Sequence, residues 1–581
     1  MSATWSWVGL VVIVGGLPAC SGTASDAALE APRPSATRDT LIIAAQSDAK
    51  DLLYVVSQAA SDSNIIEAIS TAPMDTEFDC KLTFTPAFAT SWEFSADGRS
   101  ITVHLRDDLT WQDGAPLTAE DFQFTYTLVT DPVVASPRHD MAQFMLPAAR
   151  PAVVDARTVR FDFDHEYDHT TMLSHISLPL SPQHILDSPS VDRASLRSHP
   201  VNATSPLSSG PWKVAKWDKG QSLVLVPNEA YHGPKALQPK LNRVIFKVIP
   251  EYATRLLELE NGSVDVVEQV LVSDADRLRA DHPEILLKRR GWRSMDYLAW
   301  NSLDAADYTA RKGALPPGQQ PRFEDVKPHP IFGDKEVRKA LAQAVDVDKL
   351  IKELLTSRVT GDVYGRASVG TITPALCGVH NDAIKPIGYN AAAAKARLGE
   401  LGWKDTNGDG WLDKDGMPLR YTVLINTGNA RRSKAAEIIQ SDMKAIGVDM
   451  QIDQLESGTF FERLRNKDYE AALAGWSAGL FVDPTAFWGR DSQFNFTGYH
   501  NARVDDLMKA GLSEPDYEKA KPIWQELQQV IYDDQPYAFL YWMDEIVAVH
   551  SRFQNTSVDL LSPYRKLYQW SVPVDKVKYP N

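Results

Sequence analysis

The sequence contains very little cysteine. Only 3 of its 581 residues are cysteine, too few for a fold built from disulfides or for a cysteine-rich zinc module. Basic side chains are also outnumbered, with 60 Lys and Arg against 76 Asp and Glu, which gives a formal net charge of −16 at pH 7. Proteins that coat nucleic acid or adhere broadly to anionic lipid need a basic surface, so the charge argues against both classes.

Long apolar runs are missing beyond the first twenty residues. The run at residues 5–19 is short for a membrane span, which needs about 20 residues, and has the length of a signal-peptide core. A small residue precedes Cys20, as in bacterial lipoprotein signals whose cysteine is acylated. Pro18 and the absence of Lys or Arg before the run depart from that pattern, so an ordinary secretory signal stays open. The sequence predicts an exported, membrane-anchored lipoprotein.

The remaining composition is that of a folded chain. Hydrophobic residues make up 44% and charged residues 23%, which is ordinary globular usage, and the length corresponds to roughly four domain-sized units. The chain has 15 Trp, and large flat rings suit a site that holds a ligand by shape.

Strand and helix patterns alternate along the chain. Residues 101–106 and 159–163 alternate with a period of two, as strands do. Residues 439–446 carry apolar side chains at helical spacing and end at Gly447, a residue that commonly stops a helix. Strand-like segments flank this helix, which predicts a βαβ unit and an α/β fold.

Residues 165–169 match the zinc-protease motif H-E-x-x-H, with His165 and His169 as its two histidines. His175 has the spacing of a third zinc ligand. The preceding residues alternate as a strand, and on a continuing strand the two histidines would lie about 13 Å apart, too far for one metal. We therefore expect no zinc site here, with an exported zinc hydrolase as the remote alternative.

A calcium-loop pattern starts at Asp405 and continues through Asn407, Asp409 and Asp413. The twelfth place is Gly416 rather than the bidentate Glu. A polar turn is the preferred interpretation, and weak calcium binding stays open.

Cys80 and Cys377 form a second open question. They could pair in an exported protein, but the sequence gives no distance between them.

A series of motifs then resembles one family. Residues 86–93, 97–98, 104–106 and 111–122 resemble the signature of the family 5 extracellular solute-binding proteins, the oligopeptide- and dipeptide-binding receptors of ABC importers. Further matching segments follow in order at residues 209–213, 228–233, 264–266, 337–341, 401–403 and 535–537.

This resemblance implies a three-lobed periplasmic-binding-protein fold of the α/β class, with a hinge-closing ligand cleft between lobes I and III. The implied boundaries are a signal peptide at 1–19, a tether at 20–38, lobe I at 39–80, 206–276 and 545–581, lobe II at 81–205 and lobe III at 277–544. It also implies a monomer without catalysis or cofactor, whose partners are a small peptide and a membrane-embedded permease. A non-peptide solute, such as a short sugar or metal chelate, stays open.

The resemblance also implies ligand contacts. Gln58 and Ala60 match a contact loop of the first lobe, and Trp476, Ser477 and Gly479 match a ligand-facing segment. Tyr297, Asn301 and Trp542 lie in segments whose side chains or neighbours face the cleft. Peptide receptors of this family carry an acidic residue where this chain has Gly479, so Asp483 is the candidate partner for a ligand's amino group.

Overall fold

The computed structural model describes residues 39–139, 151–231, 233, 237–316, 319–480, 482–490, 492, 494–558 and 560–579. The predicted signal peptide, the tether and Cys20 lie outside the described residues. No helix within the described part of the chain is long and apolar enough to cross a membrane.

Strands and helices alternate through the chain, as predicted. The strands are β1 (Thr40–Ala45), β2 (Met74–Asp79), β3 (Lys81–Pro86), β4 (Ala89–Phe94), β5 (Ser100–Leu105), β6 (Ala152–Asp155), β7 (Thr158–Asp162), β8 (Trp212–Asp218), β9 (Ser222–Pro227), β10 (Arg243–Val248), β11 (Val266–Val267), β12 (Ile285–Trp300), β13 (Gly365–Ala367), β14 (Asp413–Lys414), β15 (Met417–Pro418), β16 (Arg420–Asn426), β17 (Asp449–Leu455), β18 (Ala471–Ser477) and β19 (Tyr537–His550).

The helices are α1 (Ala60–Ile69), α2 (Ala119–Thr130), α4 (His169–Ile176), α5 (Gln183–Leu186), α6 (Pro200–Ala203), α7 (Tyr252–Glu260), α8 (Val272–Asp281), α9 (Ala305–Gly313), α10 (Lys335–Gln343), α11 (Val347–Leu354), α12 (Ala391–Glu400), α13 (Ala430–Ala445), α14 (Ser457–Arg465), α15 (Thr485–Trp488), α16 (Ala502–Leu512) and α17 (Tyr517–Asp534). Short 3₁₀ turns are η1 (Arg193–Ser198), η3 (Phe323–Asp325), η4 (Leu567–Gln569) and η5 (Val574–Lys576).

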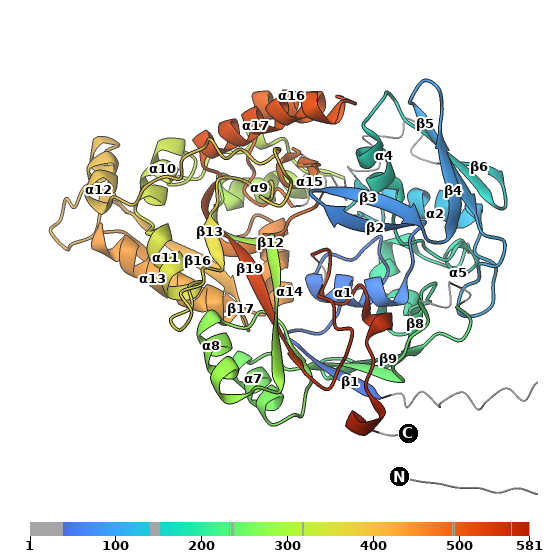
Figure 1. The fold of residues 1–581 in the computed structure, drawn as a ribbon. Coiled ribbons are helices and arrows are strands. Elements are labelled where there is room, and N and C mark those ends of the chain that lie inside the picture. The colour runs from blue at the N-terminus through green and yellow to red at the C-terminus, as the bar shows by residue number, and fades with distance from the viewer. Residues whose placement is uncertain are drawn as a thin grey trace, which may run out of the picture. The chain divides into compact units, whose positions relative to one another are not determined.

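A large sheet organises the fold, with strand order β17-β16-β18-β12-β19-β11-β1-β10-β9-β8 and β13 paired to β19. The long strands β12 and β19 pair antiparallel at its centre, from Ile285 opposite His550 to Ala299 opposite Tyr537. A register shift interrupts this pairing between Arg290 and Ser294. Figure 1 shows both strands running through the middle of the fold.

The chain passes through the centre of this sheet in β12 and returns through the centre in β19. We call residues 39–284 and 551–579 the terminal part, and residues 301–536 the central part. The terminal part contributes β11, β1, β10, β9 and β8, and the central part contributes β17, β16, β18 and β13. Two backbone strands therefore connect the two parts.

A separate four-stranded sheet, β4-β5-β7-β6, lies within the range expected for lobe II. Its core includes Phe122 of α2, which meets Phe88 and Phe161 edge-on at 5.9 Å. Such edge-to-face pairs are a favourable packing of aromatic rings. The hairpin β2–β3 forms a two-stranded sheet of its own.

The predicted βαβ unit is confirmed. Strands β16 and β17 pair in parallel, with Tyr421 opposite Met450, and α13 connects them. Asn429 caps the helix start by accepting a hydrogen bond from the Arg432 amide, and Gly447 follows the helix at a φ of 84°. Glycine adopts this left-handed conformation at little cost, which explains the stop.

Candidate functional site

A cavity of about 610 Å³ is lined by both the terminal and the central part. Its acidic side chains are Asp48, Asp51, Asp62, Glu268 and Glu456. Its basic side chains are Lys50, Arg197, Arg255, Arg432 and Arg465. The two signs are present in equal number, so the lining suits a solute that carries both charged and neutral polar groups.

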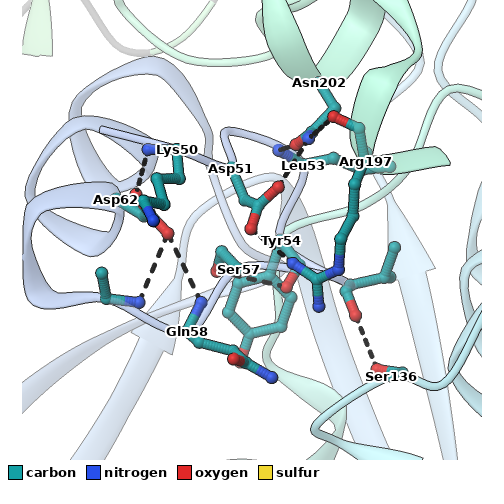
Figure 2. Close-up of polar contacts among 12 residues, drawn as sticks. Lys50, Asp51, Leu53, Tyr54, Ser57, Gln58, Asp62, Ser136, Arg197 and Asn202 are labelled. Atoms are coloured by element: carbon teal, nitrogen blue, oxygen red, sulfur yellow. Dashed lines mark hydrogen bonds and ion pairs between the residues drawn. The ribbon is translucent and has the colours of Figure 1, made fainter. Parts of the chain in front are cut away.

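Asp62 at the start of α1 shapes the terminal wall. Its carboxylate accepts hydrogen bonds from the backbone amides of Lys50 at 2.8 Å, Gln58 at 3.4 Å and Ala59 at 3.3 Å. Burial raises the pKa of Asp62 to about 6, although these donors favour the charged form. The contacts hold the loop that precedes α1 against the helix (Figure 2).

The next part of this wall comes from residues 81–205, the range predicted as lobe II. Arg197 forms an ion pair with Asp51, and Asn202 donates to the same carboxylate at 2.7 Å. Asn202 in turn accepts from the Leu53 amide at 2.8 Å. Figure 2 shows that Arg197 and Asn202 contact the loop that contains Asp51 and Leu53. These contacts hold Arg197, which lines the cavity, in position.

Arg432 of α13 lies in the central wall and is held by Asp296 of β12. Asp296 is fully buried and accepts from Arg431 Nε and Arg432 Nε, both at 3.0 Å. Burial alone would raise the pKa of Asp296, but the two guanidinium groups lower it below its ordinary value. The Asp296 carboxylate is therefore ionised at neutral pH and fixes the start of α13 on the sheet.

Gly475 of β18 lies directly under this arginine and also lines the cavity. It pairs with Asp296 across the sheet. A Cβ atom at this position would lie 2.3 Å from Arg432 Nη2 and 2.6 Å from the Met295 carbonyl oxygen. Both distances are far below van der Waals contact, so the absence of a side chain lets the guanidinium lie on the strand.

Arg465, at the end of α14, reaches across the cavity from the central part. Its Nη1 donates to Gln58 Oε1 of the terminal part at 2.5 Å. Burial lowers the pKa of Arg465, and the charge of Arg197 lowers it further. No carboxylate of the described residues lies within ion-pair distance of this guanidinium. The cavity thus holds a desolvated cation whose partner is a neutral amide.

Comparison with known proteins identifies a family with which this chain shares sequence features. The sequence model of the family described as "Bacterial extracellular solute-binding proteins, family 5 Middle" matches residues 83–498.

The chain belongs to this family.

Individual proteins and solved structures that are similar to this chain agree with the family assignment. The oligopeptide-binding protein AppA of Bacillus subtilis is 27% identical over 571 residues, covering 96% of each chain. The structure of AppA in complex with a nonapeptide superposes with a TM-score of 0.79 at 26% identity, covering 92% of this chain and 100% of that one. The probable D,D-dipeptide-binding periplasmic protein DdpA of Escherichia coli is 24% identical over 467 residues, 78% of each chain.

A protein solved with a nickel chelate rather than a peptide shares the fold. NikZ of Campylobacter jejuni, solved with Ni(L-His), has a TM-score of 0.75 at 22% identity and covers 92% of this chain and 99% of that one. The family, and the lobed α/β fold expected from it, are therefore confirmed.

Of the residues that the family resemblance singled out, Gln58 lines the cavity, and Ala60 and Trp476 adjoin lining residues in the sequence. Ala60 begins α1 beside the lining residue Ala59, and Trp476 follows the lining residue Gly475. Ser477 and Gly479 are exposed just beyond Trp476. The loop before α1 and the end of β18 thus meet at the cavity from the two parts of the chain.

Other singled-out residues lie in the core in this structure, outside the cavity lining. Tyr297 and Trp542 are fully buried on the central strands β12 and β19. The Tyr297 ring stacks on Tyr537 at 4.0 Å and faces Trp476 at 6.1 Å. Asn301 is also fully buried, and its amide donates to the carbonyl oxygen of Tyr469 at 2.8 Å. Central strands covered on both faces bury side chains of either orientation.

Asp483 also lies outside the lining. Its Oδ2 contacts His175 Nε2 of α4 at 3.1 Å, and its Oδ1 accepts from the Thr485 amide at 3.0 Å. Burial alone would raise the pKa of Asp483, but the His175 contact brings it below its ordinary value. The carboxylate expected to meet a ligand amine is instead engaged between the terminal and central parts.

The H-E-x-x-H motif adopts a different conformation from the predicted strand. Strand β7 ends at Asp162 and α4 begins at His169, so the expected continuation of the strand is wrong. His165 Nε2 contacts Ser513 Oγ at 2.7 Å, and the His169 ring stacks on Phe94 at 3.6 Å. Among the described residues, no group of three or more His, Cys, Asp or Glu side chains is placed to hold a metal ion.

The calcium-like segment uses its carboxylates to hold its own backbone. Asp405 accepts from the amides of Gly408 at 2.7 Å and Gly410 at 3.0 Å. Asp413 accepts from the Thr406 hydroxyl at 2.6 Å and amide at 2.9 Å, while Asn407 donates to Asp409 at 3.0 Å. These are the bonds of a polar turn.

The pairing of Cys80 and Cys377, which the sequence left open, is present as a disulfide. Its two α-carbons are 5.1 Å apart although the residues are separated by 297 positions. Asp51, Asp62, Glu456, Arg432 and Arg465 are cavity residues that the sequence did not single out. The signal that could have found Arg465 is its place on the helix that precedes the 475–483 segment.

Proposed function

We propose that this protein is the substrate-binding component of an ABC importer, which captures peptides outside the inner membrane and delivers them to a membrane-embedded permease. The observation that carries the proposal is the cavity between two parts of the chain that share two strand crossings. Such a cavity opens and closes by rotation about the crossings, and ligand favours the closed arrangement. AppA, 27% identical over nearly the full chain, is an oligopeptide-binding protein.

The lining suits a peptide because it offers polar groups of both signs and backbone approach at Gly475. A peptide brings one amide donor and one carbonyl acceptor per residue, and its ends are charged. We assign the carboxylate end of the ligand to Arg465. A guanidinium fits a carboxylate with two parallel hydrogen bonds, which its present amide partner cannot supply.

The remaining features of the proposal follow from the sequence. The protein acts as a monomer without catalysis, and Cys20 carries the lipid that holds it on the periplasmic side of the membrane. The lobe boundaries predicted from the sequence describe its moving units. Metabolic labelling with a fatty-acid analogue tests the anchor: wild type should be labelled and Cys20→Ala should not, whereas equal labelling would remove the lipoprotein assignment.

Mass spectrometry of small molecules released from the denatured, freshly purified protein tests the cargo. Peptides should be recovered in stoichiometric amount. A sugar or a metal chelate as the stoichiometric ligand would overturn the peptide assignment while keeping the receptor.

Calorimetry with the recovered peptide tests the role of Arg465. Arg465→Gln should weaken binding at least about thirtyfold, since truncating one member of a desolvated charged hydrogen bond costs about 2–5 kcal/mol or more. Arg420→Gln is the matched control, because Arg420 pairs with Asp449 away from the lining and is 60% exposed. Amidating the peptide's carboxyl end should weaken wild-type binding and leave the Arg465→Gln variant unaffected. Equal losses in both proteins would remove Arg465 from this role.

A further inference from the structure

The terminal and central parts are joined covalently at a third place besides β12 and β19. The disulfide links Cys80 of the terminal part to Cys377 of the central part. Neither cysteine lies in the cavity lining, and both are solvent-exposed. The backbone crossings lie in the main sheet, whereas Cys80 lies in the separate hairpin β2–β3. The disulfide therefore crosses between the two parts at a different place in the fold from the strand crossings.

Each end of the disulfide is fixed to its own part. Strands β2 and β3 pair along their whole length, from Met74 opposite Pro86 to Asp79 opposite Lys81, which leaves Cys80 at the tip. On the other side, helix α17 holds the Cys377 loop, because Gln525 donates to the Gly378 carbonyl at 3.1 Å and Gln528 donates to the Val379 carbonyl at 3.0 Å. A bond between two anchored segments restrains the parts that carry them.

The backbone at Cys80 adds a second observation. Its φ is 60°, in the left-handed region that glycine and asparagine favour. A hairpin tip that served only as a turn would be more stable with glycine there, since a non-glycine residue in this region costs on the order of 1 kcal/mol. The sequence has cysteine at this tip, and the sulfur is used in a bond to the other part.

Noncovalent contacts also connect the two parts, and these can break as the parts separate. They include His175 with Asp483 at 3.1 Å, His165 with Ser513 at 2.7 Å, and Arg465 with Gln58 at 2.5 Å. A disulfide cannot break in this way in the oxidising environment of an exported protein. Its formation removes two protons and two electrons from the two thiols, and a disulfide-containing oxidant of that compartment accepts them.

We propose that the Cys80–Cys377 disulfide is a strap that limits how far the cavity can open. The proposal rests on the opening motion described under Proposed function. The two crossing strands β12 and β19 permit a hinge rotation of one part against the other. The disulfide is a third connection, away from these strands, and it permits only rotations in which Cys80 and Cys377 stay adjacent. The ligand-free protein then stays close to its closed arrangement, so binding requires less reordering and ligand leaves more slowly.

Small-angle scattering of the full chain tests the strap without any ligand. The double variant Cys80→Ser/Cys377→Ser should have a larger radius of gyration than wild type when ligand-free. Reduction of wild type with a water-soluble phosphine should give the same increase: the S–S bond breaks, water supplies the oxygen of the phosphine oxide, and each sulfur ends as a thiol. Asp483→Ala is the matched control, because it removes the His175 contact between the same parts and should leave the radius near the wild-type value.

The release rate of bound peptide supplies a second readout. It should rise at least about threefold in the double variant, since differences between related complexes lie mainly in dissociation. An unchanged radius after reduction of folded wild type would overturn the strap, and so would two free thiols in the oxidised protein. If no solute binds while the radius still increases, the proposed function fails and the strap stands. If the double variant does not fold, the reduced wild type decides.

Discussion

Replacing Asp296 with Asn tests whether one buried carboxylate holds the central wall of the cavity. Asp296 is fully buried, and the side chains of its partners Arg431 and Arg432 are 8% and 15% exposed. Asn keeps the size of the side chain but leaves two guanidinium groups without their charge partner. Breaking a buried pair in this way costs about 3–5 kcal/mol.

Urea unfolding at pH 7, followed by tryptophan fluorescence, measures this cost. Glu526→Gln is the matched control, since Glu526 pairs with Arg503 and the two side chains are 49% and 54% exposed. Exposed ion pairs contribute about 0–1 kcal/mol. A loss for Asp296→Asn no larger than the control's would refute the argument that this charge fixes α13 on β12. Peptide affinity should fall together with stability, because Arg432 lies in the cavity lining.

The pH dependence supplies an independent check on the same residue. The folded-state pKa of Asp296 is lowered, so its contribution to stability is complete above the unfolded value of about 3.9 and is lost as pH falls through the folded-state value. The stability difference between wild type and Asp296→Asn should therefore be constant near neutral pH and shrink in acid. A difference that grew on acidification would contradict the assigned charge state.

Three further predictions follow from the same structure. Trp476→Ala should lower the free energy of unfolding of the ligand-free protein by about 3 kcal/mol in urea titrations, because its ring packs on Tyr297, Phe487, Phe494 and Phe496; unchanged stability would mean that the ring serves ligand alone. Gly475→Ala should weaken peptide binding at least about tenfold in calorimetry, since its Cβ would meet Arg432 Nη2 at 2.3 Å; wild-type affinity would show that the arginine moves freely. Because the pKa of Asp62 is raised, the folded state keeps the carboxyl proton to a higher pH than the unfolded state, and wild-type stability should fall as pH rises from about 4 to about 6. The urea midpoint of Asp62→Asn should depend less on pH over that range, and the same pH dependence in both proteins would contradict the prediction.

Local patterns predicted the βαβ unit because its information is contiguous in the sequence. The periodicity of α13, the capping residue Asn429 and the stop at Gly447 all lie within one segment. The path of residues 163–169 was predicted wrongly because alternation before His165 does not reveal where a strand ends. Strand β7 stops at Asp162, and Asp168 caps a new helix by accepting from the Thr171 amide at 3.0 Å.

The cavity could be predicted only as far as family motifs reach. Gln58 and the 475–477 segment were found because they belong to short, recognisable stretches of sequence. Arg465 was missed because its contact with Gln58 joins residues that are 407 positions apart. Asp296 was missed for the same reason: its partners lie on α13, and only the fold brings that helix onto β12. Contacts between residues so far apart in the sequence leave no local periodicity.

Two residues singled out for separate chemistry turn out to be partners. In the sequence, His175 has the spacing of a third ligand of the zinc-like motif, and Asp483 is the candidate partner for a ligand's amino group. In the structure His175 contacts the Thr171 carbonyl through Nδ1 at 2.7 Å and Asp483 through Nε2 at 3.1 Å. Both ring nitrogens therefore already face oxygen atoms of the protein, and Asp483 is not among the residues that line the cavity. The sequence indicated a chemical role for each side chain separately, but the packing of the chain brings the two side chains together across its terminal and central parts.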